Sequence, residues 1–246
     1  MSFSNTSSLQ QIRARVNNTL SHGIQIDMST EESKKLLIRH VHTKTNLVIM
    51  FIDINGSTEM SLSLSDDKFS KVIQTFAQEI SIAVIGFGGY VFKYEGDAVI
   101  SIFPAEYNQA KACKNALDCS KAVLEIIRGV INPAFKISEL PEITVRTGLA
   151  YGDVLVLLYG KNPDTAHIDI IGPCISMAAK IASTAKANQI MIGERIYNTL
   201  LSSGIEDPMY YKSILREVSL DREKWKYPSR INTGSVYRVY EYLETY

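Results

Sequence analysis

The sequence predicts an α+β domain with a ferredoxin-like (palm-like) plan: an antiparallel sheet core with helices covering one face. From residue 46 onward, strand-like and helix-like segments follow one another in an order close to β-α-β-β-α-β. Hydrophobic residues make up 46% of the chain and charged residues 21%, as in soluble proteins that bury a core. The length of 246 residues suits one large domain, or one medium domain with an appendage.

Residues 1–44 differ from the rest of the chain and are expected to form a polar, partly helical N-terminal arm. They are rich in Ser, Asn, Thr and Gln, and helical patterns are confined to residues 9–20 and 30–41. Ser29 or Thr30, followed by acidic residues, is typical of a helix start. Contact with a partner, regulation and a solvated tail all remain open as roles. Residues 45–246 are expected to form the main domain, including a C-terminal strand extension.

The sequence of the first half of this domain predicts a strand, then a helix and then a hairpin. A continuous apolar run at residues 47–52 indicates a buried strand, and apolar residues recur at helical spacing over residues 69–84. Glycines then end the helix. Two further strands, at 90–93 and 98–103, flank a tight turn at 94–97.

The second half predicts a long helix over residues 107–131, closed by Pro133. The remaining expected elements are strands at 143–150 and 154–158 around Gly152 and Asp153, a helix at 173–185, a strand at 190–192 and late strands at 213–218 and 236–242.

Charge and apolar run lengths exclude several classes of protein. Lys plus Arg and Asp plus Glu number 26 each, so no net field draws the chain to nucleic acid, and no basic, aromatic track marks a nucleic-acid partner. The apolar stretches are too short for a membrane span, and no secretory signal begins the chain, so we expect a cytoplasmic protein. Three cysteines without a CxxC pair indicate buried apolar residues, not a disulfide framework or a zinc cluster.

Two aspartates are candidate metal ligands. Asp53 follows the apolar strand, and Asp97 lies in the hairpin turn beyond the next helix. Carboxylates at a strand end and on an adjacent hairpin can converge, and paired carboxylates that bridge two Mg²⁺ ions serve phosphoryl and nucleotidyl transfer. Each aspartate taken alone also fits a turn or cap residue.

The segment after Asp53 is a candidate triphosphate site. It contains a glycine-bearing turn and two hydroxyls at an expected helix start, where backbone N–H groups can hold phosphate. Simple capping of that helix by Ser57 or Thr58 is the alternative, and the two interpretations can hold together. The residues are Asn55, Gly56, Ser57 and Thr58.

Three motifs in order resemble the signatures of class III adenylyl and guanylyl cyclases: FIDINGST at 51–58, FKYEGDAV at 92–99, and RTG at 146–148 with GDV at 152–154. The resemblance extends over roughly residues 46–200. It implies that Asp53, Asp97 and the backbone carbonyl of Ile54 hold two Mg²⁺ or Mn²⁺ ions per site. It also implies a homodimer whose active sites are shared between two chains.

The resemblance assigns base recognition to Lys93 and Asp169, which match the adenine form of the family. Lys donates to adenine N1 and Asp accepts from the N6 amino group. The chain departs from the family pattern at Ser176 and Lys180, where Asn and Arg are usual. Ser reaches less far than Asn, and Lys keeps the charge but loses the planar fork of Arg.

We therefore expect an adenylyl cyclase that converts ATP to 3′,5′-cyclic AMP and pyrophosphate, with Ser176 and Lys180 as catalytic residues. Two alternatives stay open: a cyclase for GTP or a pyrimidine triphosphate, and a nucleotide-binding or dimerisation module with weak or no turnover.

Overall fold

A single mixed sheet of eight strands forms the centre of the computed structural model, which describes residues 6–24, 26–162, 165–221 and 223–243. The strand order is β2-β3-β1-β4-β6-β8-β7, and β5 pairs with β4. All neighbouring pairs are antiparallel except β4 with β6, which is parallel. The α+β prediction is confirmed. The strands are β1 (Lys44–Ile54), β2 (Tyr90–Glu95), β3 (Ala98–Pro104), β4 (Val145–Tyr159), β5 (His167–Ile171), β6 (Gln189–Gly193), β7 (Leu215–Glu217) and β8 (Val239–Tyr242).

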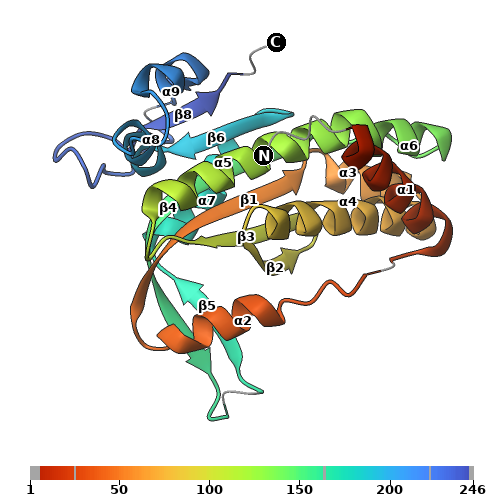
Figure 1. Cartoon of the computed structure of the whole chain (residues 1–246), viewed down its shortest axis with the longest axis horizontal. Helices are drawn as coiled ribbons and strands as arrows, with labels where there is room; N and C mark the ends of the chain where they lie inside the picture. Colours follow the sequence, from red (N-terminus) through yellow and green to blue (C-terminus); the bar gives the residue numbers. More distant parts are fainter. Residues whose placement is uncertain (1–5, 25, 163–164, 222, 244–246) are drawn as a thin grey trace.

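Helices cover both faces of the sheet, although one covered face was expected (Figure 1). Val48, Met50 and Ile52 of β1 point into the core formed with α1, α4 and α5, whereas Leu47 and Ile49 point into the core formed with α2 and α7. Two covered faces explain why β1 is a continuous apolar run. The helices are α1 (Thr6–His22), α2 (Glu31–Leu37), η1 (Ile38–His40), α3 (Ser57–Ser63), α4 (Asp66–Gly86), α5 (Gln109–Ile126), η2 (Ile127–Ile131), α6 (Asn132–Ile137), α7 (Pro173–Thr184), α8 (Glu194–Leu201) and α9 (Pro208–Ile214).

Three sequence-based boundaries were wrong. Gly152 and Asp153 do not break a strand, because both lie inside the 15-residue β4. Pro133 does not end the long helix: a π-helical turn, η2, follows α5, and Pro133 then lies in the first turn of α6, where proline's missing N–H is not needed. The expected strand from residue 213 begins only at Leu215, after α9.

The N-terminal arm packs against the domain through α1. Ile12, Val16 and Leu20 are buried in the same core as α4. The guanidinium of Arg15 donates to both carboxylate oxygens of Glu79, whose side chain is fully buried. These contacts make α1 part of the folded unit. In the described part of the chain, none of the helices has the length and apolar character that crossing a bilayer requires.

Gly148 allows the closest approach of α7 to the sheet. A Cβ atom at this position would lie 2.6 Å from the carbonyl oxygen of Ala178 and would also meet the backbone nitrogen of Ala182. Both clashing groups belong to backbone, so neither can move without shifting the helix. Glycine at position 148 therefore allows α7 to pack directly against β4.

We expect Gly148→Ala to lower the free energy of unfolding by about 3 kcal/mol, because α7 must move away from β4. Urea unfolding followed by circular dichroism measures this. Gly86→Ala is the matched control, since a Cβ there meets nothing within 4 Å. Equal stability of the two variants would contradict the proposed close packing.

Candidate active site

Strand register brings Asp53 and Asp97 to the same end of the sheet. Asp53 pairs with Ala98 of β3, the residue directly after Asp97, and with Arg146 of β4 on its other side. Nη2 of Arg146 donates a hydrogen bond to Oδ2 of Asp53. The antiparallel pairing of three strands therefore places two carboxylates beside one guanidinium. We refer to Asp53 and Asp97 as the carboxylate pair.

The carboxylate pair carries more negative charge than its surroundings neutralise. The pKa of Asp53 is raised to about 6: burial contributes most, the hydrogen bond and the charge of Asp97 add to it, and Arg146 opposes both effects. Oδ2 of Asp97 is buried and has no hydrogen-bond partner among the described residues. In the unfolded chain Asp53 releases its proton near pH 3.8, so its ionisation lowers the stability of the folded state as the pH rises from about 4 to about 6.

This arrangement fits a divalent cation that shares its coordination shell with a ligand. The described residues contain no group of three or more His, Cys, Asp or Glu side chains suited to a metal. Mg²⁺ is commonly bound by one or two carboxylates together with water and substrate phosphates, so a pair suffices. Ile54, the last residue of β1, is buried next to Asp53.

The turn after β1 begins at Asn55, whose N–H donates to the Thr144 carbonyl at 2.8 Å, and leads into an uncapped helix start. Gly56 is the N-cap of α3 with φ of 79°, a left-handed conformation that favours glycine, and no side chain caps this helix. The capping alternative for Ser57 or Thr58 is therefore wrong. Asn55 and Thr58 are exposed and Ser57 is half-buried. The structure thus places an uncapped turn directly beside the carboxylate pair.

Lys93 and Asp169 form a preorganised ion pair. Nζ of Lys93 on β2 lies 2.8 Å from Oδ2 of Asp169 on β5, and the backbone N–H of Ile170 donates to Oδ1 of Asp169 at 2.8 Å. Both side chains are partly exposed, at 32% and 25%. This ion pair joins two strands whose residues lie 76 positions apart in the sequence. We refer to these two residues as the base-recognition pair, after the role that the family resemblance predicts for them.

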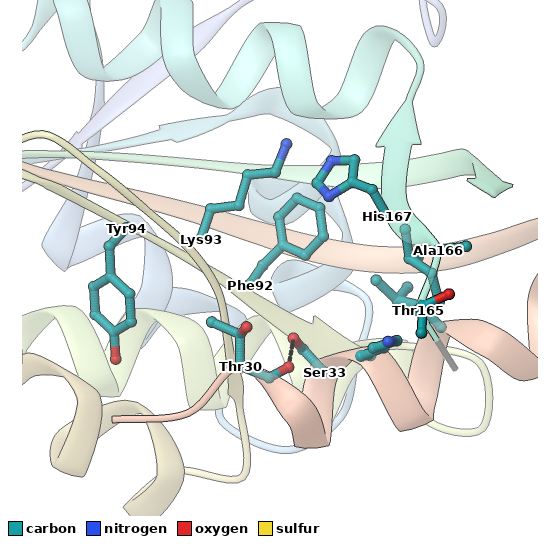
Figure 2. Close-up of a pocket in the computed structure, with 11 residues that line it drawn as sticks. Thr30, Ser33, Phe92, Lys93, Tyr94, Thr165, Ala166 and His167 are labelled. Carbon is teal, nitrogen blue, oxygen red and sulfur yellow. Dashed lines mark hydrogen bonds between the residues drawn. The ribbon is translucent and has the colours of Figure 1, made fainter. Parts of the chain in front are cut away.

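A cavity of about 420 Å³ adjoins this pair. Figure 2 shows the Lys93 side chain extending toward His167, while Thr30 and Ser33 of the N-terminal arm form the opposite wall. His167 Nε2 lies 3.7 Å from Oδ2 of Asp169. The arm therefore contributes to the surroundings of Lys93.

Ser176 and Lys180 lie one helical turn apart on the exposed face of α7. Oγ of Ser176 donates to the carbonyl of Gly172 at 3.4 Å, and Nζ of Lys180 lies 4.7 Å from the centre of the Tyr227 ring. Among the described residues, no hydrogen bond or ion pair connects the carboxylate pair to the base-recognition pair. Ser176 and Lys180 likewise form no hydrogen bond or ion pair with either pair.

Sequence reasoning assigned no role to two residues that the structure connects to the site. Arg146 was noted only within a motif, and its position opposite Asp53 is set by the register of β1 with β4. Tyr227 lies 47 residues after Lys180 along the chain, in a segment without regular structure, and no periodicity pointed to it.

Comparison with curated proteins finds relatives named as nucleotide cyclases. A cytidylate cyclase of Escherichia coli is 26% identical over 204 residues, covering 79% of this chain and 43% of the relative. A cytidylate cyclase of Staphylococcus aureus is 30% identical over 60% of this chain and 36% of the relative. Adenylate cyclase type 10 of Rattus norvegicus is 26% identical over 65% of this chain and 10% of the relative. The chain spans less than half the length of each of these proteins.

The fold is also that of a solved cyclase. The adenylyl cyclase CyaB of P. aeruginosa superimposes with a TM-score of 0.68 at 18% identity, covering 83% of this chain and 96% of that one. The family model for the adenylate and guanylate cyclase catalytic domain matches residues 40–221, about three quarters of the sequence. Fold, motif positions and family match agree, and the chain belongs to the class III nucleotide cyclase family.

Proposed function

We propose that this chain cyclises a nucleoside triphosphate whose base presents an exocyclic amino group next to a ring-nitrogen acceptor, ATP or CTP, to its 3′,5′-cyclic monophosphate and pyrophosphate. The observation that carries the proposal is the base-recognition pair, held at 2.8 Å within a chain of the cyclase family. ATP is the substrate expected from the sequence. The cytidylate cyclases among the relatives favour CTP as the second candidate.

The chemistry of the pair favours purine or pyrimidine bases that present an amino group next to a ring-nitrogen acceptor. Adenine presents an acceptor, N1, next to its N6 amino group, and cytosine presents N3 next to its N4 amino group. An ammonium that donates and a carboxylate that accepts match both. Guanine and uracil carry a ring N–H in place of that acceptor and a carbonyl in place of the amino group. Lys93 would then face a donor, and a site whose groups are placed to hydrogen-bond one base discriminates against a base that leaves them unpaired.

The proposed reaction forms a bond between the ribose O3′ and the α-phosphorus and breaks the bond from that phosphorus to the pyrophosphate oxygen. The O3′ proton is released, and pyrophosphate leaves with the bonding electrons. Asp53, Asp97 and the Ile54 carbonyl would hold two Mg²⁺ or Mn²⁺ ions per site. When bound, such ions polarise the phosphate and lower the pKa of the attacking hydroxyl.

Other residues of the chain would bind and orient the substrate. The turn of Asn55, Gly56, Ser57 and Thr58 would receive the triphosphate through the backbone N–H groups at the uncapped start of α3, since the Asn55 N–H already donates to Thr144. Ser176 would donate a hydrogen bond to the ribose. Lys180 would place its positive charge at the reacting phosphate, where a fixed charge stabilises the transition state.

We further propose that two copies of the chain share each site. The carboxylate pair would come from one protomer, and the base-recognition pair with Ser176 and Lys180 from its partner. The lack of direct contact between these groups in the described part of one chain supports this division. Two-fold symmetry would then give two equivalent sites.

Incubation of the protein with ATP, CTP, GTP or UTP and Mn²⁺, followed by mass spectrometry of the products, tests the proposed reaction. We expect cyclic AMP or cyclic CMP to dominate, and we expect Asp53→Asn to lower kcat at least about 100-fold. Asp66→Asn, an exposed carboxylate on α4, is the control and should retain full activity. Exclusive formation of cyclic GMP or UMP would contradict the assignment of the pair, and absence of all cyclic products would favour the binding-module alternative.

Mixing two inactive variants tests the shared site. Asp53→Asn and the double variant Lys93→Ala/Asp169→Ala should each be inactive alone. After subunit exchange, half of the dimers are mixed and each contains one intact site, so activity should return to about one quarter of the wild-type value. Native mass spectrometry verifies the exchange. No recovery in a verified mixed dimer would show that all of these residues act within one chain.

A further inference from the structure

The charged end of Lys180 rests on an aromatic ring. Its Nζ lies 4.7 Å from the ring centre of Tyr227, within the range of a cation–π interaction. Among the ion pairs of the described residues, none includes Lys180. An exposed lysine side chain otherwise samples many conformers, and holding it in one place costs conformational entropy. The ring therefore restrains the ammonium group on the outer face of α7.

Tyr227 is itself held firmly. The Trp225 ring packs edge-on against it with ring centres 4.9 Å apart, and Trp225 is 6% exposed. Nε1 of Trp225 donates to the carbonyl of Tyr237 at 2.8 Å, and the Tyr237 N–H donates back to the Tyr227 carbonyl at 2.7 Å. These bonds close residues 225–237 into a loop whose two ends support each other.

A buried carboxylate anchors the same loop to the sheet. Glu194, at the start of α8, is fully buried and accepts hydrogen bonds from Ser229 Oγ at 2.7 Å and from the Arg238 N–H at 3.1 Å. A buried carboxylate is costly unless it is hydrogen-bonded, so both contacts fix the loop to β6 and α8. Tyr227 thus presents its ring from a rigid support.

We propose that Tyr227 is a positioning residue that holds the Lys180 ammonium group for the reaction. This inference rests on the proposed cyclase function. An aromatic face attracts a cation without adding a negative charge, so Lys180 keeps its full charge for the phosphate. A carboxylate in the same place would neutralise that charge. Tyr227 lies beyond residue 221, where the family match ends, so the C-terminal segment belongs to the catalytic unit.

Replacement of the ring tests this role by kinetics. Tyr227→Leu keeps an apolar side chain but removes the ring, and kcat should fall about 3- to 30-fold while KM changes less than about twofold. Tyr227→Phe keeps the ring and should retain kcat within about twofold, because the hydroxyl is not required. Tyr107→Leu, which removes a tyrosine that is 96% exposed, is the control. Thermal unfolding verifies that each variant folds.

A second measurement detects the contact between Lys180 and Tyr227 and does not depend on catalytic activity. Reductive ¹³C-methylation labels the lysines, and a methylammonium group above an aromatic face shows an upfield NMR shift. The Lys180 signal, identified with Lys180→Arg, should be upfield in the wild type and in Tyr227→Phe but not in Tyr227→Leu.

Unchanged kcat in Tyr227→Leu, an equal loss in Tyr227→Phe, or a Lys180 signal without an upfield shift would each overturn the inference. A wild type that shows the shift but forms no cyclic nucleotide would instead overturn the proposed function, and with it the catalytic purpose of the contact. The two failures are therefore distinguishable.

Discussion

The antiparallel pairing of β1 with β3 and with β4 is the constraint on which the site depends. This register leaves no freedom in where Asp53 lies: it has Asp97 on one side and Arg146 on the other. The central strands are apolar on both faces, so the polar groups at their end sit close to a low-dielectric interior. Burial and a neighbouring carboxylate then raise the pKa of Asp53 to about 6, and one guanidinium does not balance two carboxylates. A cation supplied with the substrate would complete the charge balance.

Much of this plan could be predicted from the sequence, because the relevant signals are local. The apolar run of β1, the helical spacing in α4 and the turn before Ala98 each lie within a short window, and they fixed the order of the elements and the positions of Asp53 and Asp97. The family motifs then identified Lys93 and Asp169. Which residues contact each other across the sheet also depends on register, which these local patterns do not specify. Two strands separated at Gly152 were expected where the structure has the single strand β4.

The remaining errors have non-local causes. Proline usually ends a helix. Here a π-helical turn precedes Pro133, and the residue lies in the first turn of the next helix, where proline is tolerated. The close packing of α7 against the sheet depends on Gly148, which has no side chain and so lets α7 approach β4. No pattern in residues 143–150 predicts that contact. The contact of Tyr227 with Lys180 joins a loop to a helix by aromatic packing, which has no periodic signature.

The central claim is that Asp53 and Asp97 form the metal site, and Mn²⁺ titration of the protein at several pH values tests it most directly. Electron paramagnetic resonance of free Mn²⁺, with a non-cyclisable triphosphate analogue present, gives stoichiometry and affinity. We expect two ions per site, and we expect the apparent Kd to rise about tenfold per unit as the pH falls below about 6, because Mn²⁺ must then displace the Asp53 proton. Asp53→Asn should abolish tight binding. Tight binding that survives in Asp53→Asn, or that does not depend on pH between 5 and 7, would contradict the assignment.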